Sequence, residues 1–170
     1  MQRPWRLNLQ NGCINNAMSA DEFWKRPIET LNREQWEALC DGCGKCCLHK
    51  LEDDLTGEVY HTNVSCRLLD LKTGRCSDYK HRRVYVPDCL RLTPKLARDL
   101  PWLPDTCAYR LRADGDPLPD WHYLICGDRE AVHAAGQSVR GKAISETVSG
   151  PLEEHVVPAD YFDNKGKTGA

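Results

Sequence analysis

The sequence has few of the residues that fill a typical hydrophobic core, and it lacks any long apolar run. Only two Met and two Phe occur among 170 residues, against ten Pro and twelve Gly. No stretch approaches the roughly 18 apolar residues of a membrane-spanning helix, and residues 1–10 contain no apolar segment typical of a signal peptide. We therefore expect no membrane partner and a cytoplasmic location.

An excess of charge of one sign is also missing. The chain carries 23 basic and 25 acidic residues, a formal net charge of −2, so no nucleic-acid partner is expected. The phosphate loop, the dinucleotide-binding glycine motif and the G-x-S-x-G nucleophile motif are all absent from the sequence. These absences indicate no particular class of enzyme, and no protein partner is identified.

Cysteine, in contrast, is abundant, with ten residues in the chain. In a reducing compartment, structural disulfides are rare and clustered thiols are typical of metal or redox sites. A chain interrupted by many Pro and Gly has a thin core, and a bound metal can supply the cross-link that such a core needs. We interpret the cysteines as metal ligands.

The chain divides into three parts by composition. Residues 1–18 are predicted to be a disordered or extended appendage, residues 19–149 the cysteine-rich metal-binding domain, and residues 150–170 a flexible C-terminal tail. Ser19 and Glu22 have the spacing of a helix capping box at the domain start, and Met18 is a possible alternative start of translation. Cys13 precedes this point and is left out of the metal site.

The expected fold is α+β: a small irregular domain, organised by metal, with short helices and hairpins. Asn32 and Gln35 predict a capped helix that runs to about Cys40. Thr93 followed by Pro94 predicts another helix start. The further expected elements are hairpins over residues 48–64 and 66–76, a helix opened by Asp105 and carrying Cys107, and a helix over residues 128–135.

The most informative motif is C-x-x-C-x-x-C-C, over residues 40–47. Two thiols three residues apart can bind one metal ion, because the intervening pair makes a tight turn that directs both sulfurs inward. Gly42 and Gly44 allow the positive φ angles of such turns. Backbone N–H groups in the loop, together with Lys45, offset the charge of the thiolates.

Four later cysteines also lie near predicted turns. The predicted metal ligands are therefore Cys40, Cys43, Cys46, Cys47, Cys66, Cys76, Cys89 and Cys107. Eight thiols allow two four-thiolate sites, one iron–sulfur cluster with spare cysteines, or a two-metal site with shared sulfurs. Cys46 and Cys47 are adjacent, and neighbouring side chains point in different directions. Their sulfurs are therefore expected to bind different metal ions or different faces of one site.

The motif and its surroundings resemble a known bacterial family. The single residues that carry the resemblance are Cys76, Tyr79, Arg82 and Cys89. The segments that carry it are Phe23–Arg26, Leu39–Leu51, Thr62–Val64, Trp102–Pro104, Thr106–Arg110, Leu118–Pro119, Trp121–His122 and Ser138–Arg140. Over residues 20–145 the chain is similar to the YcgN-like branch of the YkgJ-type CxxCxxCC zinc- or iron-chelating domains. The family itself is uncharacterised, and its chelating label implies zinc or iron as cofactor. Gly74 departs from members that have a further cysteine there, and Cys126 is extra to the pattern.

The choice between an iron–sulfur cluster and zinc stays open at this stage. The x2, x2 spacing resembles that of bacterial ferredoxins, but no cysteine here is followed by Pro. Zinc sites more often pair two separate C-x-x-C units, and only one region of this chain has that spacing. The predicted function is a metal-binding protein with a structural, storage or redox-sensing role; the alternative is an iron–sulfur enzyme or electron carrier.

His49 comes shortly after the cysteine motif. It is expected to lie beside the metal site and not to bind the metal.

Overall fold

The computed structural model describes residues 21–163. Its α-helices are short: α1 (Arg33–Ala38), α2 (Arg82–Tyr85), α3 (Pro94–Asp99), α4 (Ala108–Asp114), α5 (Tyr123–Cys126), α6 (Ala131–Ala134) and α7 (Glu146–Ser149). The strands are β1 (Leu48–Glu52), β2 (Val59–Ser65), β3 (Leu69–Asp70), β4 (Arg75–Cys76), β5 (Ile144–Ser145) and β6 (Val156–Val157). Single 3-10 turns are η1 (Phe23–Lys25), η2 (Ile28–Thr30), η3 (Lys45–Cys47) and η4 (Leu152–His155). The predicted α+β class is confirmed.

The strands form two small sheets. In the larger one, β2 pairs antiparallel with β1 and β6 and parallel with β5. The smaller sheet is the β3–β4 hairpin, in which Leu69 lies opposite Cys76. Both hairpins predicted from the turn residues are therefore present.

Two helix starts follow the predicted capping chemistry. The Asn32 side chain accepts a hydrogen bond from the Gln35 backbone N–H at 2.9 Å, and the Gln35 side chain accepts one from the Asn32 N–H at 3.0 Å. This reciprocal pair satisfies two N–H groups that the first turn of a helix leaves unpaired. At α3, Thr93 caps the helix and Pro94 occupies its first turn, as predicted.

Other boundaries differ from the predictions. Cys107 lies before α4 as its N-cap residue instead of on the helix, because the helix begins at Ala108. The helix expected over residues 128–135 is shorter, from Ala131 to Ala134. Ser19 and Cys13 lie outside the described residues. Of the predicted tail, residues 150–163 are described; they contain β6, which pairs with β2, and the buried Phe162.

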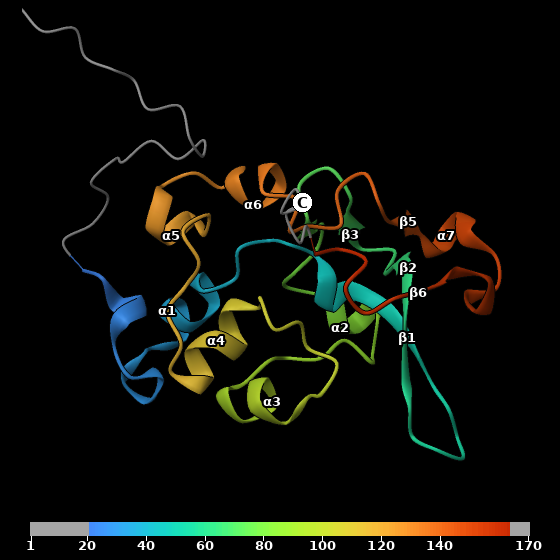
Figure 1. Ribbon diagram of the computed structural model, residues 1–170, viewed down its shortest axis with the longest axis horizontal. Helices are drawn as coiled ribbons and strands as arrows, with labels where there is room; N and C mark the ends of the chain where they lie inside the picture. The colour runs from blue at the N-terminus through green and yellow to red at the C-terminus, as the bar shows by residue number, and fades with distance from the viewer. Residues whose placement is uncertain (1–20, 164–170) are drawn as a thin grey trace, which may run out of the picture.

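The buried side chains form two separate hydrophobic clusters. Figure 1 shows α1, α3 and α4, which contribute to the larger cluster, to the left of the strands β1 and β2. The larger cluster packs α1, α3 and α4 together and includes Trp36, Leu39 and Tyr109. The smaller cluster lies under the sheets and includes Leu48, Leu69 and Val139. The cysteine-rich loop over residues 40–47 connects α1 to β1, so it runs from one cluster to the other.

Candidate metal centre

The loop over residues 40–47 is held by a turn and by close packing. The Asp41 side chain accepts a hydrogen bond from the Cys43 backbone N–H at 2.9 Å, which fixes a tight turn between Cys40 and Cys43. Gly44 follows with a φ of +77°, and a Cβ atom there would lie 2.7 Å from a methyl carbon of Val139. The Val139 N–H also donates to the Cys43 carbonyl at 2.9 Å.

Four of the eight predicted ligands line one pocket. They are Cys40, Cys43, Cys46 and Cys107. Three come from the loop, and Cys107 comes from the start of α4. Asp41 and Tyr109 also line this thiol pocket, whose cavity of about 20 Å³ is large enough for one water-sized species.

The pKa values of all four pocket thiols are raised. Burial among protein atoms raises the pKa of Cys40 and Cys43, and the charges of the neighbouring thiols and Asp41 add to the effect. For Cys46, a hydrogen bond with the Cys47 thiol is the first cause of the raised pKa and burial the second. Burial raises the pKa of Cys107 to about 12. Without a bound cation these thiols are therefore protonated at neutral pH.

The sulfurs face one cavity but do not form a finished coordination sphere. Within residues 21–163, no three His, Cys, Asp or Glu side chains are arranged to hold a metal ion as they stand. The donor chemistry nevertheless fits a soft divalent ion, because thiolates are preferred ligands of zinc and iron.

Three further predicted ligands, Cys66, Cys76 and Cys89, do not line the thiol pocket but lie near one another. The pKa of Cys66 is raised by burial first, and the charges of Cys89 and Cys76 contribute. The Cys66 N–H donates to the Cys47 carbonyl at 2.9 Å, and the Cys47 side chain packs against the smaller hydrophobic cluster. Cys47 thus lies between this group and the thiol pocket, because its thiol also contacts that of Cys46, which lines the pocket.

Lys50 is the amine beside the thiols. Its Nζ donates to the carbonyls of Leu48, Lys45 and Cys46 at 2.6, 3.2 and 3.3 Å and lies 4.4 Å from the centroid of the Trp102 ring. Burial lowers the pKa of Lys50, and the charges of Cys46, Cys47 and Cys43 oppose that shift. Lys50 lies outside the cysteine motif, so the motif spacing gives no indication of its position beside the thiols.

Lys45, which was expected to offset the charge of the thiolates, has other partners. It is buried, and its Nζ contacts Thr106 Oγ1 at 3.1 Å, Gln137 Oε1 at 3.4 Å and the Asp163 carboxylate. Lys45 therefore connects the loop to the C-terminal segment of the described chain.

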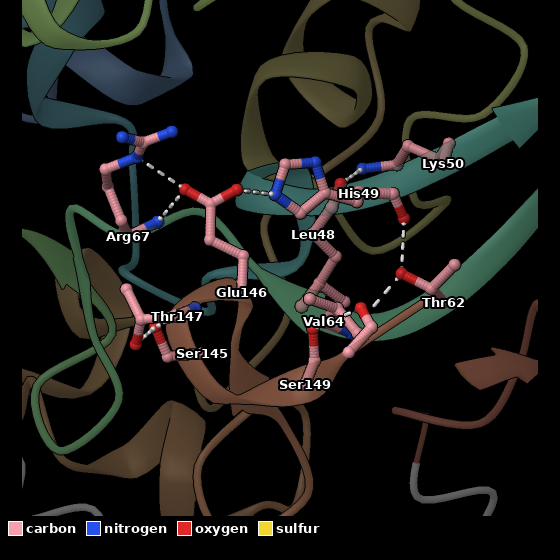
Figure 2. Close-up of polar contacts among 11 residues, drawn as sticks. Leu48, His49, Lys50, Thr62, Val64, Arg67, Ser145, Glu146, Thr147 and Ser149 are labelled. Carbon is pink, nitrogen blue, oxygen red and sulfur yellow. Dashed lines mark hydrogen bonds and ion pairs between the residues drawn. The ribbon is translucent and has the colours of Figure 1, made fainter. Parts of the chain in front are cut away.

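His49 does not line the thiol pocket and instead contacts Glu146. Its Nε2 lies 2.7 Å from Oε2 of Glu146, although the ring N–H is not aligned for a directed hydrogen bond. Figure 2 shows the Glu146 carboxylate between His49 and Arg67, whose backbone N–H and Nε donate to it at 2.9 and 2.7 Å. Burial would raise the pKa of Glu146, but these contacts outweigh burial and lower it.

Cys126 is separate from both groups of thiols. It is buried on α5, and its sulfur lies 3.6 Å from the carbonyls of Trp121 and Asp128. The nine cysteines of residues 21–163 are all free thiols. In the same part of the chain, no helix is long and apolar enough to cross a membrane.

The comparison with known proteins agrees with this cysteine pattern. Residues 39–108 match the CxxCxxCC family model, described as “Putative zinc- or iron-chelating domain”. The match begins at the end of α1 and ends at the first residue of α4, so it includes the thiol pocket. By domain class, this is a cysteine-rich protein of a metal-chelating type. No solved structure matches the chain.

Closer relatives identify the family. A UPF0260 protein of Rhizorhabdus wittichii is 60% identical over 142 residues, which cover 82% of this chain and 97% of the relative. UPF0260 proteins of Gluconacetobacter diazotrophicus (56% over 135 residues; 79% and 84% covered) and Azotobacter vinelandii (53% over 144 residues; 83% and 97% covered) are also similar. The chain belongs to the UPF0260 family.

Proposed function

We propose that the protein binds zinc or iron through its cysteines, with the thiol pocket of Cys40, Cys43, Cys46 and Cys107 as the principal site. The observation that carries this proposal is the convergence of four thiols from two distant segments on one small cavity. An isolated buried cysteine is commonly only a small hydrophobic residue. Four that share a cavity with a carboxylate have no such packing role.

The remaining predicted ligands form a second group in this proposal. Burial raises the pKa of Cys66, and the charges of Cys89 and Cys76 add to that effect, which places both near Cys66; Cys47 is joined to Cys66 by a backbone hydrogen bond. Two groups of four thiols correspond to the first arrangement allowed by the sequence, two separate four-thiolate sites. The adjacent pair Cys46 and Cys47 then contributes one thiol to each group.

The size of the cavity favours a single ion in the principal site. A cavity of about 20 Å³ has room for one water-sized species, which is enough for one metal ion. Binding draws the sulfurs in to the roughly 2.3 Å of a zinc–thiolate bond. It also releases the thiol protons, so affinity increases with pH.

This chemistry supports a structural, storage or redox-sensing role in the cytoplasm, where thiols stay reduced. The charge of Lys50 partly balances the thiolates. Metal binding also ties the start of α4 to the end of α1. The free energy of binding then contributes directly to folding.

Metal analysis with an ultraviolet–visible spectrum, on protein purified without oxygen or chelators, tests the proposal. We expect zinc or iron, and no acid-labile sulfide. Sulfide with a broad visible absorption would replace the single ion by a cluster and favour an iron–sulfur enzyme or electron carrier. Protein that is metal-free and does not take up added zinc or ferrous iron would refute the proposal.

A pair of variants assigns the metal to the pocket. Cys107→Ser should lower the zinc affinity at least tenfold, because one thiolate is lost. Cys126→Ser changes a cysteine of the same chain that lies outside both groups, and its zinc affinity should match that of the wild type. Equal affinities for Cys107→Ser and Cys126→Ser would show that the pocket is not the site.

A further inference from the structure

Asp41 is a buried acid, and one of its carboxylate oxygens has no hydrogen-bond partner among the described residues. It is 5% exposed and lines the thiol pocket. One carboxylate oxygen, Oδ1, accepts the hydrogen bond from the Cys43 N–H. The other, Oδ2, is buried and has no hydrogen-bond partner among the described residues.

A buried carboxylate oxygen without a partner is unfavourable, so buried acids are normally paired with a base or bound to a metal. The bases whose pKa values respond to Asp41 are His122 and His133. Burial lowers the pKa of both, which favours their neutral forms. His122 is already used, because its Nε2 lies 3.0 Å from the Leu39 carbonyl and its Nδ1 accepts from the Leu124 N–H.

The nearby lysines do not supply the missing cation. Lys45 is paired with Asp163, and Lys50 contacts three backbone carbonyls. No ion pair to Asp41 is formed within residues 21–163, where every ion pair joins other residues. The carboxylate therefore faces the thiols with no positive charge bound to it.

We propose that Asp41 is itself a metal ligand, binding through Oδ2 the same ion that the pocket thiols hold. This inference rests on the proposed function and adds a hard oxygen donor to a site predicted from sulfur alone. Zinc accepts carboxylate oxygen at about 2.0–2.2 Å beside cysteine sulfur. In a four-coordinate site the oxygen takes one position, and Cys107 with two of the three loop thiols takes the others, so one loop thiol lies outside the first coordination sphere.

The electrostatics of the pocket agree with this geometry. The charge of Asp41 contributes to the raised pKa of all four pocket thiols, after burial or a neighbouring thiol as the first cause. Asp41 is thus close to each of them. A cation placed among them removes the repulsion between carboxylate and thiolates and supplies the partner that Oδ2 lacks.

The competing explanation is that Asp41 serves only the turn. Asp70 provides a matched control, because its Oδ1 makes the same type of turn, accepting from the Lys72 and Thr73 N–H groups at 2.8 and 3.3 Å. Asp70 is exposed and does not line the pocket. Both Asp41→Asn and Asp70→Asn retain an oxygen that can accept the turn hydrogen bond, but only Asp41→Asn removes a charge from the pocket.

The first test measures zinc affinity by competition with a chelator. We expect Asp41→Asn to lower the affinity about tenfold or more, and Asp70→Asn to leave it within about twofold of the wild type. The absorption bands of Co²⁺ bound in place of zinc should change position in Asp41→Asn, because their energies depend on the donor set. An Asp41→Asn protein with wild-type affinity and an unchanged cobalt spectrum would overturn the inference.

A second measurement uses the wild-type chain, in case Asp41→Asn fails to fold. Infrared difference spectra with and without zinc should show a shifted carboxylate stretching band if a carboxylate binds the ion, and the absence of this shift would refute the role of Asp41. Failure of the wild type to bind zinc or ferrous iron at all would instead refute the proposed function. The two failures are therefore distinguishable.

Discussion

Gly74 allows a sharp test of how the thiol pocket is supported. It lies in the turn of the β3–β4 hairpin with a φ of +69°, and a Cβ atom there would be 1.9 Å from the carbonyl oxygen of Gly42. Real Cβ atoms essentially never approach closer than 3.0 Å, so the backbone of one of the two loops must move by about 1 Å. Gly42 lies between Cys40 and Cys43, and the displacement would be passed directly to the pocket.

The loss of stability expected for Gly74→Ala has two parts, backbone strain and overpacking, and Gly57→Ala is a control that shows the strain alone. Gly57 has almost the same φ, +70°, but nothing lies within 4 Å of its added Cβ. Gly57→Ala should therefore show only the backbone strain, about 1–2 kcal/mol. Gly74→Ala should show that strain plus about 1–3 kcal/mol of overpacking.

Urea unfolding of the zinc-loaded proteins measures both parts, and zinc competition measures the effect on the pocket. We expect Gly74→Ala to be less stable than Gly57→Ala and to bind zinc more weakly. Equal unfolding free energies and equal affinities would refute the idea that the β3–β4 turn supports the cysteine loop. The same collision explains why a cysteine, or any other side chain, has no room at this position.

Two further predictions concern the polar contacts around the loop. Lys45→Met should lower the free energy of unfolding by about 1.5–3 kcal/mol, because the partly buried Asp163 carboxylate loses its charged partner. The exposed Lys95→Met should cost no more than about 0.5 kcal/mol, and equal losses in the two variants would refute this reasoning. The pKa of Glu146 is lowered by Arg67 against the effect of burial, so its contribution to stability is present above its ordinary pKa of 4.5 and is lost as the pH falls through the lowered pKa. Urea titrations across this range should show the wild type and Glu146→Gln converging at low pH, and a difference independent of pH would contradict the assignment.

Local features of the fold were predictable because their causes are local. The capping box of Asn32 and Gln35, the Thr93–Pro94 helix start and both hairpins depend on residues within a few positions of one another. The C-x-x-C-x-x-C-C spacing likewise identified three of the four thiols that line the pocket.

The fourth pocket thiol depends on tertiary packing. Cys107 reaches the loop because α4 packs on α1, where the Trp36 and Tyr109 rings lie 4.8 Å apart and the Tyr109 hydroxyl donates to the Glu37 carbonyl at 3.4 Å. Nothing in the spacing distinguishes Cys107 from Cys66, Cys76 or Cys89. The sequence therefore predicted eight ligands without indicating which of them meet.

The roles of Asp41 and Lys50 were missed for a related reason. An Asp before Gly is typical of an exposed turn, and Asp41 does make that turn. It is buried in the folded chain, where it lines the thiol pocket together with Pro104, Cys107 and Tyr109 from a distant segment. Asp41 makes a turn and also lines the pocket, whereas Asp70 makes only a turn. The residues next to each Asp in the sequence do not reveal this difference.

The position of the loop explains why a thin core is sufficient for this chain. Neither hydrophobic cluster is large, and the backbone of residues 40–47 is the direct covalent link between them. Cys107 packs against the larger cluster and Cys47 against the smaller one. A metal bound to the thiol pocket would join the loop to α4 and the larger cluster, while a second ion held by Cys47 and the group around Cys66 would join it to the β3–β4 hairpin. Each ion would then close a long chain segment in the folded state, which gives folding the stabilisation that apolar burial alone provides in larger domains.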